Sequence, residues 1–401
     1  MARLPDGERP PAAGELPATA LRGLGAPDRP FGIYVHVPYC TTRCGYCDFN
    51  TYIPSEAGPE GFVGAIAAEL ALARRTLGDA TPPAQTVFVG GGTPTLLPPS
   101  DLAAIVELID EHVGLAPDAE VTTEANPETV DPASLAALRA AGFTRISLGM
   151  QSAAPHVLAT LDRRHTPGRA AEAAREAREA GFEHVSLDLI YGTPGETADD
   201  WRMSVQAALE AGPDHVSAYS LIVEPGTKLA ARVRRGELPM PDDDVLAERY
   251  ETTEALMAQA GLGWYEVSNW ARTDADRCRH NMGYWAGGDW WGVGPGAHSH
   301  VGGVRWWNVL HPARWMALLA DGASPAGGRE VPDDDAARLE RVMLGVRLRE
   351  GLLLENDDAG QRAAAEQLVG DGLVELREDG RVVLTLRGRL LADRVTLALA
   401  G

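Results

Sequence analysis

Short apolar runs rich in β-branched residues alternate with longer stretches of helical period along most of the chain. Each run ends in glycine, proline or a polar turn, a pattern typical of buried parallel strands. The predicted strands are residues 32–37, 86–90, 119–125, 144–150, 184–190 and 215–221. The helices between them are expected at 59–77, 100–113, 132–141, 167–180 and 197–211. Repeated strand–helix units favour right-handed βαβ connections, and therefore an open or closed α/β barrel.

The pattern changes on both sides of this α/β region. The N-terminal segment is rich in proline, alanine and glycine without a sustained period, which predicts a disordered or loose arm. The C-terminal segment is expected to form two helices and a hairpin with a tight turn at Asp379-Gly380, an outline that resembles a winged helix. The predicted divisions are an arm (1–30), a barrel (31–240), a connecting region (241–330) and a winged-helix-like domain (331–401).

Charge and hydropathy exclude several classes of partner. The formal net charge is −21, so the surface repels phosphate backbones, and we expect no nucleic-acid partner. Residues 331–401 hold 14 acidic and 10 basic residues, a net of −4, which favours a structural or protein-contact role over DNA binding. No apolar run approaches the roughly 18–20 residues that span a bilayer, and the N-terminus lacks a signal-peptide pattern. We therefore expect a cytoplasmic protein without a membrane span.

Three of the four cysteines lie within eight residues, in the segment CTTRCGYCDFN. Thiolates bind soft metals and iron–sulfur clusters. A structural zinc site normally has four protein ligands, whereas this spacing supplies Cys40, Cys44 and Cys47 only. A cubane held by three thiolates would leave one iron open to a small molecule. Two alternatives stay open from the residues alone: a zinc site completed by His36, and a redox pair of Cys44 and Cys47.

The segment YVHVPYCTTRCGYCDFN resembles the signature of the radical S-adenosylmethionine (SAM) superfamily. In that superfamily SAM binds the open iron of a [4Fe-4S] cluster, and one electron can then release a 5′-deoxyadenosyl radical. The resemblance implies a partial (β/α)6 barrel with a C-terminal helical, winged-helix-like domain. It assigns the cluster to Cys40, Cys44 and Cys47, and it includes Phe49, the aromatic residue two positions after the third cysteine.

Polar residues and glycines stand at the ends of the predicted strands, where ligands of α/β barrels bind. Three glycines follow strand 86–90, more than a tight turn needs, and their N–H groups can approach an anion. Buried carboxylates such as Glu124 and Asp188 are costly unless paired, although structural strand-end contacts would also explain them. Arg163 could equally neutralise Asp188. The resemblance to the coproporphyrinogen-oxidase-like branch implies these SAM contacts: Tyr34, Gly91, Gly92, Thr93, Glu124, Gln151, Arg163 and Asp188.

A second motif, HNMGYW, occupies residues 280–285. If this segment is helical, His280 and Tyr284 share one face and Asn281 and Trp285 form the adjacent pair. An imidazole beside aromatic rings suits an iron porphyrin. The alternative is a core histidine held by hydrogen bonds beside packing tryptophans.

The segment from HNMGYW through GGDWWGVGPGAHSH resembles HemW-type haem chaperones. The anaerobic coproporphyrinogen III oxidases instead carry a fourth cysteine at the position of Phe49, so oxidase activity is not expected. The resemblance implies a chaperone that binds haem and a SAM-ligated cluster and delivers haem to respiratory haem proteins at the membrane. The implied haem contacts are His280, Asn281, Tyr284 and Trp285, with Cys278, His298 and His300 as rival iron ligands. A radical SAM methyltransferase or a porphyrinogen oxidase is the alternative, and either would cleave SAM.

Overall fold

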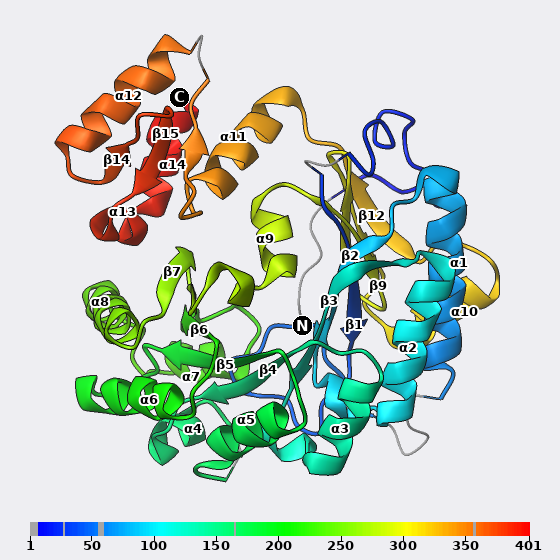
Figure 1. Ribbon diagram of the computed structural model, residues 1–401, viewed down its shortest axis with the longest axis horizontal. Helices are drawn as coiled ribbons and strands as arrows, with labels where there is room; N and C mark the ends of the chain where they lie inside the picture. The colour runs from blue at the N-terminus through cyan, green and yellow to red at the C-terminus, as the bar shows by residue number, and fades with distance from the viewer. Residues whose placement is uncertain (1–6, 27–28, 55–59, 164–165, 356–357) are drawn as a thin grey trace.

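The computed structural model describes residues 7–26, 29–54, 60–163, 166–355 and 358–401 (Figure 1). Within these residues one mixed sheet has 12 strands, in the order β12-β11-β10-β9-β1-β2-β3-β4-β5-β6-β8-β7. The six predicted strands are confirmed as β1 (Phe31–Val37), β2 (Ala84–Gly91), β3 (Leu115–Ala125), β4 (Arg145–Gln151), β5 (His184–Tyr191) and β6 (His215–Ser220). Each pairs in parallel with the next, which forms the partial barrel.

Helices cover the outer face of the six parallel strands (Figure 1). The predicted helices are confirmed as α1 (Phe62–Leu77), α2 (Pro99–His112), α3 (Pro132–Ala140), α5 (Arg169–Glu179) and α6 (Ala198–Glu210). Capping boxes at Asp131 and Thr197 begin α3 and α6, because each side chain accepts a hydrogen bond from an otherwise free N–H. Shorter or later helices are α4 (Pro155–Thr160), α7 (Lys228–Arg234) and α8 (Asp243–Gln259). Outward-facing Val87, Ile146 and Leu187 are fully buried against this helical layer.

The region 241–330 extends the sheet at both edges and is more than a connection. At one edge, β9 (Asp289–Val293) pairs in parallel with β1, and β10 (His298–Val301), β11 (Val304–Asn308) and β12 (Ala326–Glu330) follow in antiparallel order. At the other edge, β8 (Asn269–Ala271) and β7 (Gly263–Glu266) follow β6. The same region supplies α9 (Arg279–Trp285) and α10 (Pro312–Ala320). As a result β1, which precedes the cysteine segment, lies between two parallel neighbours.

Residues 7–26 of the N-terminal segment, for which composition predicted a disordered or loose arm, contact the edge of the sheet. Glu8 exchanges two backbone hydrogen bonds with Arg329 of β12, and Ala20 is fully buried. The outer strand of a sheet has unpaired N–H and C=O groups that a passing chain can satisfy. Composition could not reveal this docking, because the partner strand lies some 300 residues away in the sequence. Residues 1–6 and 27–28 of the predicted arm lie outside the described residues.

The last 70 residues form a separate core, in the predicted order of helix, helix and hairpin. The elements are α11 (Asp334–Gly345), β13 (Leu352–Leu353), α12 (Ala359–Gly370), β14 (Val374–Leu376), β15 (Arg381–Leu384), α13 (Leu386–Leu390) and α14 (Ala392–Ala400). Val342, Val382 and Val395 are fully buried within this core. Arg389 joins the domain to the barrel, because its guanidinium donates to Glu254 at 2.8 Å and lies 4.4 Å from the Trp264 ring centroid. Among the described helices of the whole chain, none has the length and apolarity that crossing a membrane requires.

Candidate cofactor-binding site

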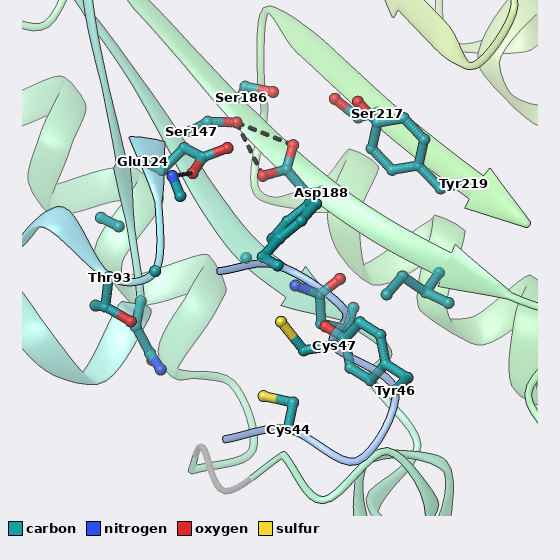
Figure 2. Close-up of a pocket in the computed structure, with 18 of the residues that line it drawn as sticks. Cys44, Tyr46, Cys47, Thr93, Glu124, Ser147, Ser186, Asp188, Ser217 and Tyr219 are labelled. Carbon is teal, nitrogen blue, oxygen red and sulfur yellow. Dashed lines mark hydrogen bonds between the residues drawn. The ribbon is translucent and has the colours of Figure 1, made fainter. Parts of the chain in front are cut away.

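A cavity of about 470 Å³ lies inside the partial barrel, toward the C-terminal ends of its strands (Figure 2). Alternate residues of a strand point to the same face, so polar side chains at every second position line the cavity. Examples are Ser147 on β4, Ser186 and Asp188 on β5, and Ser217 and Tyr219 on β6. These inward side chains give the barrel a polar interior that can hold a polar ligand.

The loop after β1 holds the three cysteines at the mouth of this cavity. Its ends are pinned together, since Cys40 N donates to Tyr52 O at 3.0 Å and Tyr52 N donates to Pro38 O at 2.7 Å. All three thiols are free and half-buried, and Cys44 and Cys47 line the cavity (Figure 2). Burial raises the pKa of the Cys40 thiol, and it raises the pKa of Cys47 to about 11. Isolated thiolates are therefore disfavoured here, and a cationic partner such as iron would stabilise them.

Two polar neighbours of the thiols fit a thiolate-ligated group. Arg163 directs Nη1 toward Cys44 Sγ at 3.8 Å, and the Thr93 hydroxyl lies 3.7 Å from Cys40 Sγ. A guanidinium at this position offsets the negative charge of thiolate ligands. Arg163 also donates to Gly149 O at 2.8 Å, and the described residues include no ion pair between it and Asp188. Arg163 is therefore directed at the cysteine loop.

The zinc alternative for His36 does not fit the geometry. Its Nε2–H donates to Asn50 O at 2.9 Å, and its Nδ1 accepts from the Tyr34 hydroxyl at 2.9 Å. Both ring nitrogens are thus occupied, and the imidazole ties the end of β1 to the end of the cysteine loop. A fourth protein ligand from His36 would require both hydrogen bonds to be rearranged.

The glycine-rich turn after β2 packs directly behind the cysteine loop. Gly92 N donates to Val37 O at 2.8 Å, and Thr93 N donates to Tyr39 O at 2.7 Å. A Cβ at residue 92 would lie 2.5 Å from Tyr39 O, so a larger residue would force the two segments apart. Gly91 adopts a φ of 110°, a backbone conformation that only glycine tolerates well. The turn therefore needs its glycines for close approach to the loop as well as for any ligand.

The two predicted carboxylates lie close to each other in the cavity wall. Glu124 Oε2 accepts from Gly91 N at 2.9 Å, and both oxygens of Asp188 accept from the Ser147 hydroxyl at 2.9 Å. Burial raises the pKa of Glu124 to about 7 and that of Asp188 to about 6. Figure 2 shows both carboxylates across the cavity from the sulfurs of Cys44 and Cys47. Each retains acceptor capacity toward the cavity, where a cationic or hydrogen-bonding ligand would satisfy it.

Gln151 and Tyr34 occupy different surroundings. Gln151 lines the cavity and has a φ of 63°, at an irregularity in the pairing of β4 with β5. A left-handed non-glycine residue of this kind is uncommon and clusters at ligand sites. Tyr34 lies outside the cavity lining, with its ring stacked 6.3 Å from that of Phe88, which does line it. The other predicted SAM contacts, Gly91, Gly92, Thr93, Glu124, Arg163 and Asp188, all line this one cavity.

The HNMGYW segment lies in helix α9, which meets the condition set for its side-chain pairs, and its residues face different surroundings. Asn281 lines the cavity, together with Cys278, which stands just before α9. His280 is buried, with Nδ1 2.8 Å from the Thr86 hydroxyl and Nε2 2.7 Å from the Tyr284 hydroxyl. Burial lowers the pKa of His280 to about 4, so the imidazole is neutral. This geometry matches the core-histidine interpretation of the motif.

Trp285 is half-buried and donates a hydrogen bond to buried Glu266. This hydrogen bond lowers the pKa of Glu266, but burial raises it more, so the net pKa is raised to about 7. Phe49 is 59 % exposed at the rim of the cavity. A large apolar side chain with this exposure at a cavity mouth is well placed to contact a ligand.

Several cavity residues were not predicted, notably Thr122, Arg145, Ser186, His215 and Ser217. A signal for them was present, because polar residues recur at every second position within the strands TRISLGM, HVSLDLI and HVSAYSL. In a parallel barrel covered by helices, such alternation marks the face that points into the lumen.

Known proteins resemble this chain in sequence and in fold. Residues 34–208 match the model of the Radical SAM superfamily. "Heme chaperone HemW" of Mycobacterium tuberculosis is 57% identical over 96% of this chain and 98% of its own length. "Radical S-adenosyl methionine domain-containing protein 1, mitochondrial" of Bos taurus is 36% identical over 89% of this chain and 82% of its own. The structure of coproporphyrinogen III oxidase (HemN) from Escherichia coli superposes with a TM-score of 0.80 at 23% identity, covering 95% of this chain and 92% of that one, which shows the fold.

The fold and the cysteine loop thus define a radical SAM protein. Membership of this class implies SAM and a [4Fe-4S] cluster as cofactors. Identity over nearly the full length narrows the assignment. The chain belongs to the HemW family within the radical SAM superfamily.

Proposed function

We propose that this protein is a cytoplasmic haem chaperone that carries a SAM-ligated [4Fe-4S] cluster and delivers haem to respiratory haem proteins. The observation that carries the proposal is the 57% identity, over 96% of the chain, to a protein named as a heme chaperone. The arrangement of three thiols beside a polar cavity supports the cluster and SAM parts of the proposal.

Cys40, Cys44 and Cys47 would hold the cluster, which when bound supplies an open iron and a single electron. The chain's own residues shape the neighbouring cavity for SAM. Glu124 and Asp188 present carboxylates to a ligand that carries an amino group and a sulfonium, while the glycine turn at 90–92 sets its backbone beside the cysteine loop. Desolvation of both carboxylates strengthens electrostatic contacts that a ligand would make with them.

A radical SAM enzyme is the second candidate, and one observation favours it. Deeper in the cavity, the Thr122 hydroxyl and Arg145 Nη1 are buried without a hydrogen-bond partner among the described residues. Unsatisfied polar atoms facing a cavity suggest a further ligand, as a substrate would be. Against an oxidase, Phe49 stands where coproporphyrinogen oxidases have their extra cysteine, so we expect no decarboxylation of coproporphyrinogen III.

Anaerobic reconstitution with iron and sulfide, followed by SAM, a reductant and either haem or coproporphyrinogen III in separate reactions, tests both candidates together. A chaperone should develop a Soret band with added haem and should lose it to an apo-form of a respiratory haem protein. An enzyme should convert SAM to 5′-deoxyadenosine or to S-adenosylhomocysteine in multiple turnovers. Protein that binds no haem but turns over SAM would replace the first candidate with the second, and formation of protoporphyrinogen IX would restore the oxidase.

A further inference from the structure

A second recess, of about 320 Å³, lies beside the cysteine loop and outside the main cavity. Its wall includes Tyr34, Phe49, Tyr284, Trp290 and His298. The volume falls within the roughly 300–1,000 Å³ typical of small-molecule pockets, and four of these five side chains are a phenyl, a phenol or an indole ring. Phe49 lines this recess and the main cavity alike, so the two spaces are neighbours across the cysteine loop.

His280 is poorly suited to bind iron from this recess. It is only 3 % exposed, and its ring stacks 5.3 Å from that of Phe88. Coordination through Nε2 would take the imidazole from the Tyr284 hydroxyl and leave that phenol without its partner. The hydrogen bond between His280 Nε2 and the Tyr284 hydroxyl instead positions Tyr284, whose ring centroid lies 4.5 Å from that of Trp290 in the recess wall.

His298 has the opposite properties. It is exposed at the start of β10, and within the described part of the chain neither ring nitrogen has a hydrogen-bond partner. Its main chain is held in place, because Trp290 Nε1 donates to His298 O at 2.9 Å. A free imidazole on a fixed strand can coordinate a metal without breaking an existing contact.

The other rival ligands face elsewhere. His300 shares the face of β10 with His298, but its Nδ1–H donates to Gly288 O at 2.8 Å and it is absent from the recess wall. Cys278 is buried, and its thiol lies 3.7 Å from Glu120 Oε1 at the floor of the main cavity. His36 also lines the recess, but both of its ring nitrogens are hydrogen-bonded, to Tyr34 and to Asn50. His298 is therefore the imidazole that an iron porphyrin in the recess could bind without breaking an existing hydrogen bond.

We propose that haem binds in this recess with His298 as its axial iron ligand and with Trp290, Tyr284 and Phe49 against the macrocycle. The inference rests on the proposed haem-binding function and adds the position and the ligand. Flat aromatic rings contribute stacking area to a porphyrin, and imidazole is a common axial ligand of haem iron. In this arrangement Phe49, in the place of a fourth cysteine, forms a shared wall between haem and cluster.

The experiment is a ferric haem titration of cluster-reconstituted protein, comparing wild type with His298→Ala, His280→Ala and His300→Ala. We expect His298→Ala to shift the Soret band and to weaken haem affinity at least tenfold, while cluster content and circular dichroism stay unchanged because the side chain is exposed. Added imidazole should restore the wild-type band position in His298→Ala only. His300→Ala, two residues away on the same strand, should retain the wild-type spectrum.

Distinct results separate this inference from the proposed function. If wild type shows no haem spectrum at all, the haem-chaperone function itself fails. If wild type binds haem and His298→Ala binds it with an unchanged spectrum, the function stands and the ligand assignment is wrong. A changed spectrum in His280→Ala or His300→Ala, with His298→Ala unaffected, would move the iron to that histidine. Should His280→Ala lose its fold, His280→Gln, which removes the imidazole but keeps a side chain that can hydrogen-bond to Thr86 and Tyr284, provides the same comparison in a milder variant.

Discussion

Two buried glutamates, Glu69 and Glu124, share one electrostatic property and differ in what surrounds them. Burial raises the pKa of each to about 7. Glu69, on α1, accepts from Gly294 N at 2.8 Å, Asn308 Nδ2 at 2.6 Å and Trp315 Nε1 at 2.8 Å. Glu124 accepts from Gly91 N and otherwise faces the cavity.

The contrast shows what a perturbed pKa can and cannot identify. Desolvation raises the pKa of a carboxyl group wherever it is buried, in a structural contact as in a ligand site. The two carboxylates are separated by the direction of their remaining acceptor capacity. Three donors, Gly294, Asn308 and Trp315, occupy the acceptor sites of the Glu69 carboxylate. The remaining acceptor sites of Glu124 point into the cavity, where a ligand can bind. Glu69 therefore holds the fold together, and Glu124 is available for binding.

The largest expected effect concerns the three thiols beside the cavity that Glu124 faces. Replacing Cys40, Cys44 or Cys47 by Ala should abolish the cluster, because a cubane with two protein thiolates has lost a third of its anchors. Iron and sulfide analysis with the absorbance near 400 nm, roughly the region of thiolate-to-iron bands, measures this. Cys278→Ala is the matched control and should keep its iron. A triple Ala variant that retained about four irons per chain would contradict the cluster assignment.

The two carboxylate sites should respond in opposite ways to substitution. Glu69→Ala leaves three buried donors without an acceptor and should lower the free energy of unfolding by roughly 3–5 kcal/mol, with SAM affinity unchanged in the folded protein. Glu124→Ala with Asp188→Ala should lower SAM affinity at least tenfold and change unfolding by only about 1–2 kcal/mol. Denaturant unfolding and SAM-induced changes in the cluster spectrum test the pair. Equal SAM responses in both variants would remove the distinction.

The pH dependence of SAM binding sharpens the comparison further. Folding raises the pKa of Glu124 from 4.5 to about 7 and of Asp188 from 3.8 to about 6, so the folded chain keeps protons that the unfolded chain releases. Their contribution to stability is therefore present at about pH 4 and is lost as pH rises toward 7. A cationic ligand prefers the ionised carboxylates, so the thermal shift caused by SAM should grow between about pH 5.5 and 8. Glu124→Gln should flatten this rise in the thermal shift, and Glu69→Gln should leave the rise unchanged. A thermal shift that does not vary with pH in the wild type would contradict contact between SAM and the two carboxylates.

The smallest expected effect concerns His280, which resembles Glu69 in having its polar atoms satisfied by the protein. Tyr284→Phe removes the partner of His280 Nε2 and should cost about 1 kcal/mol of stability, the usual net value of one hydrogen bond. The Soret position should not change, because the proposed iron ligand lies on β10. Chemical denaturation of the reconstituted protein measures the first effect. A cost near zero would mean that the hydroxyl contact contributes nothing to holding α9.

The sequence predicts local features of this molecule well and distant pairings poorly. The six parallel strands and the helices between them follow from patterns within a few residues. The pairing of β9 with β1 and of Glu8 with Arg329 depends on edges that only the assembled sheet offers. The surroundings of His280 were hidden from the sequence in the same way. The partners Thr86 and Tyr284 become visible only when α9 is packed against β2.

Asn50, at the end of the cysteine loop, is held by backbone groups of residues that are translated much later. Its side-chain nitrogen donates to Pro295 O at 2.9 Å and to Leu310 O at 2.8 Å. The loop is thus held by peptide groups some 245 to 260 residues downstream, a large sequence separation that must be closed before its geometry is fixed. While the chain is still on the ribosome, the first 290 residues contain every cysteine of the motif but lack these contacts. Iron–sulfur insertion should therefore follow synthesis of nearly the whole barrel, and a chain truncated before residue 295 should fail to retain a cluster.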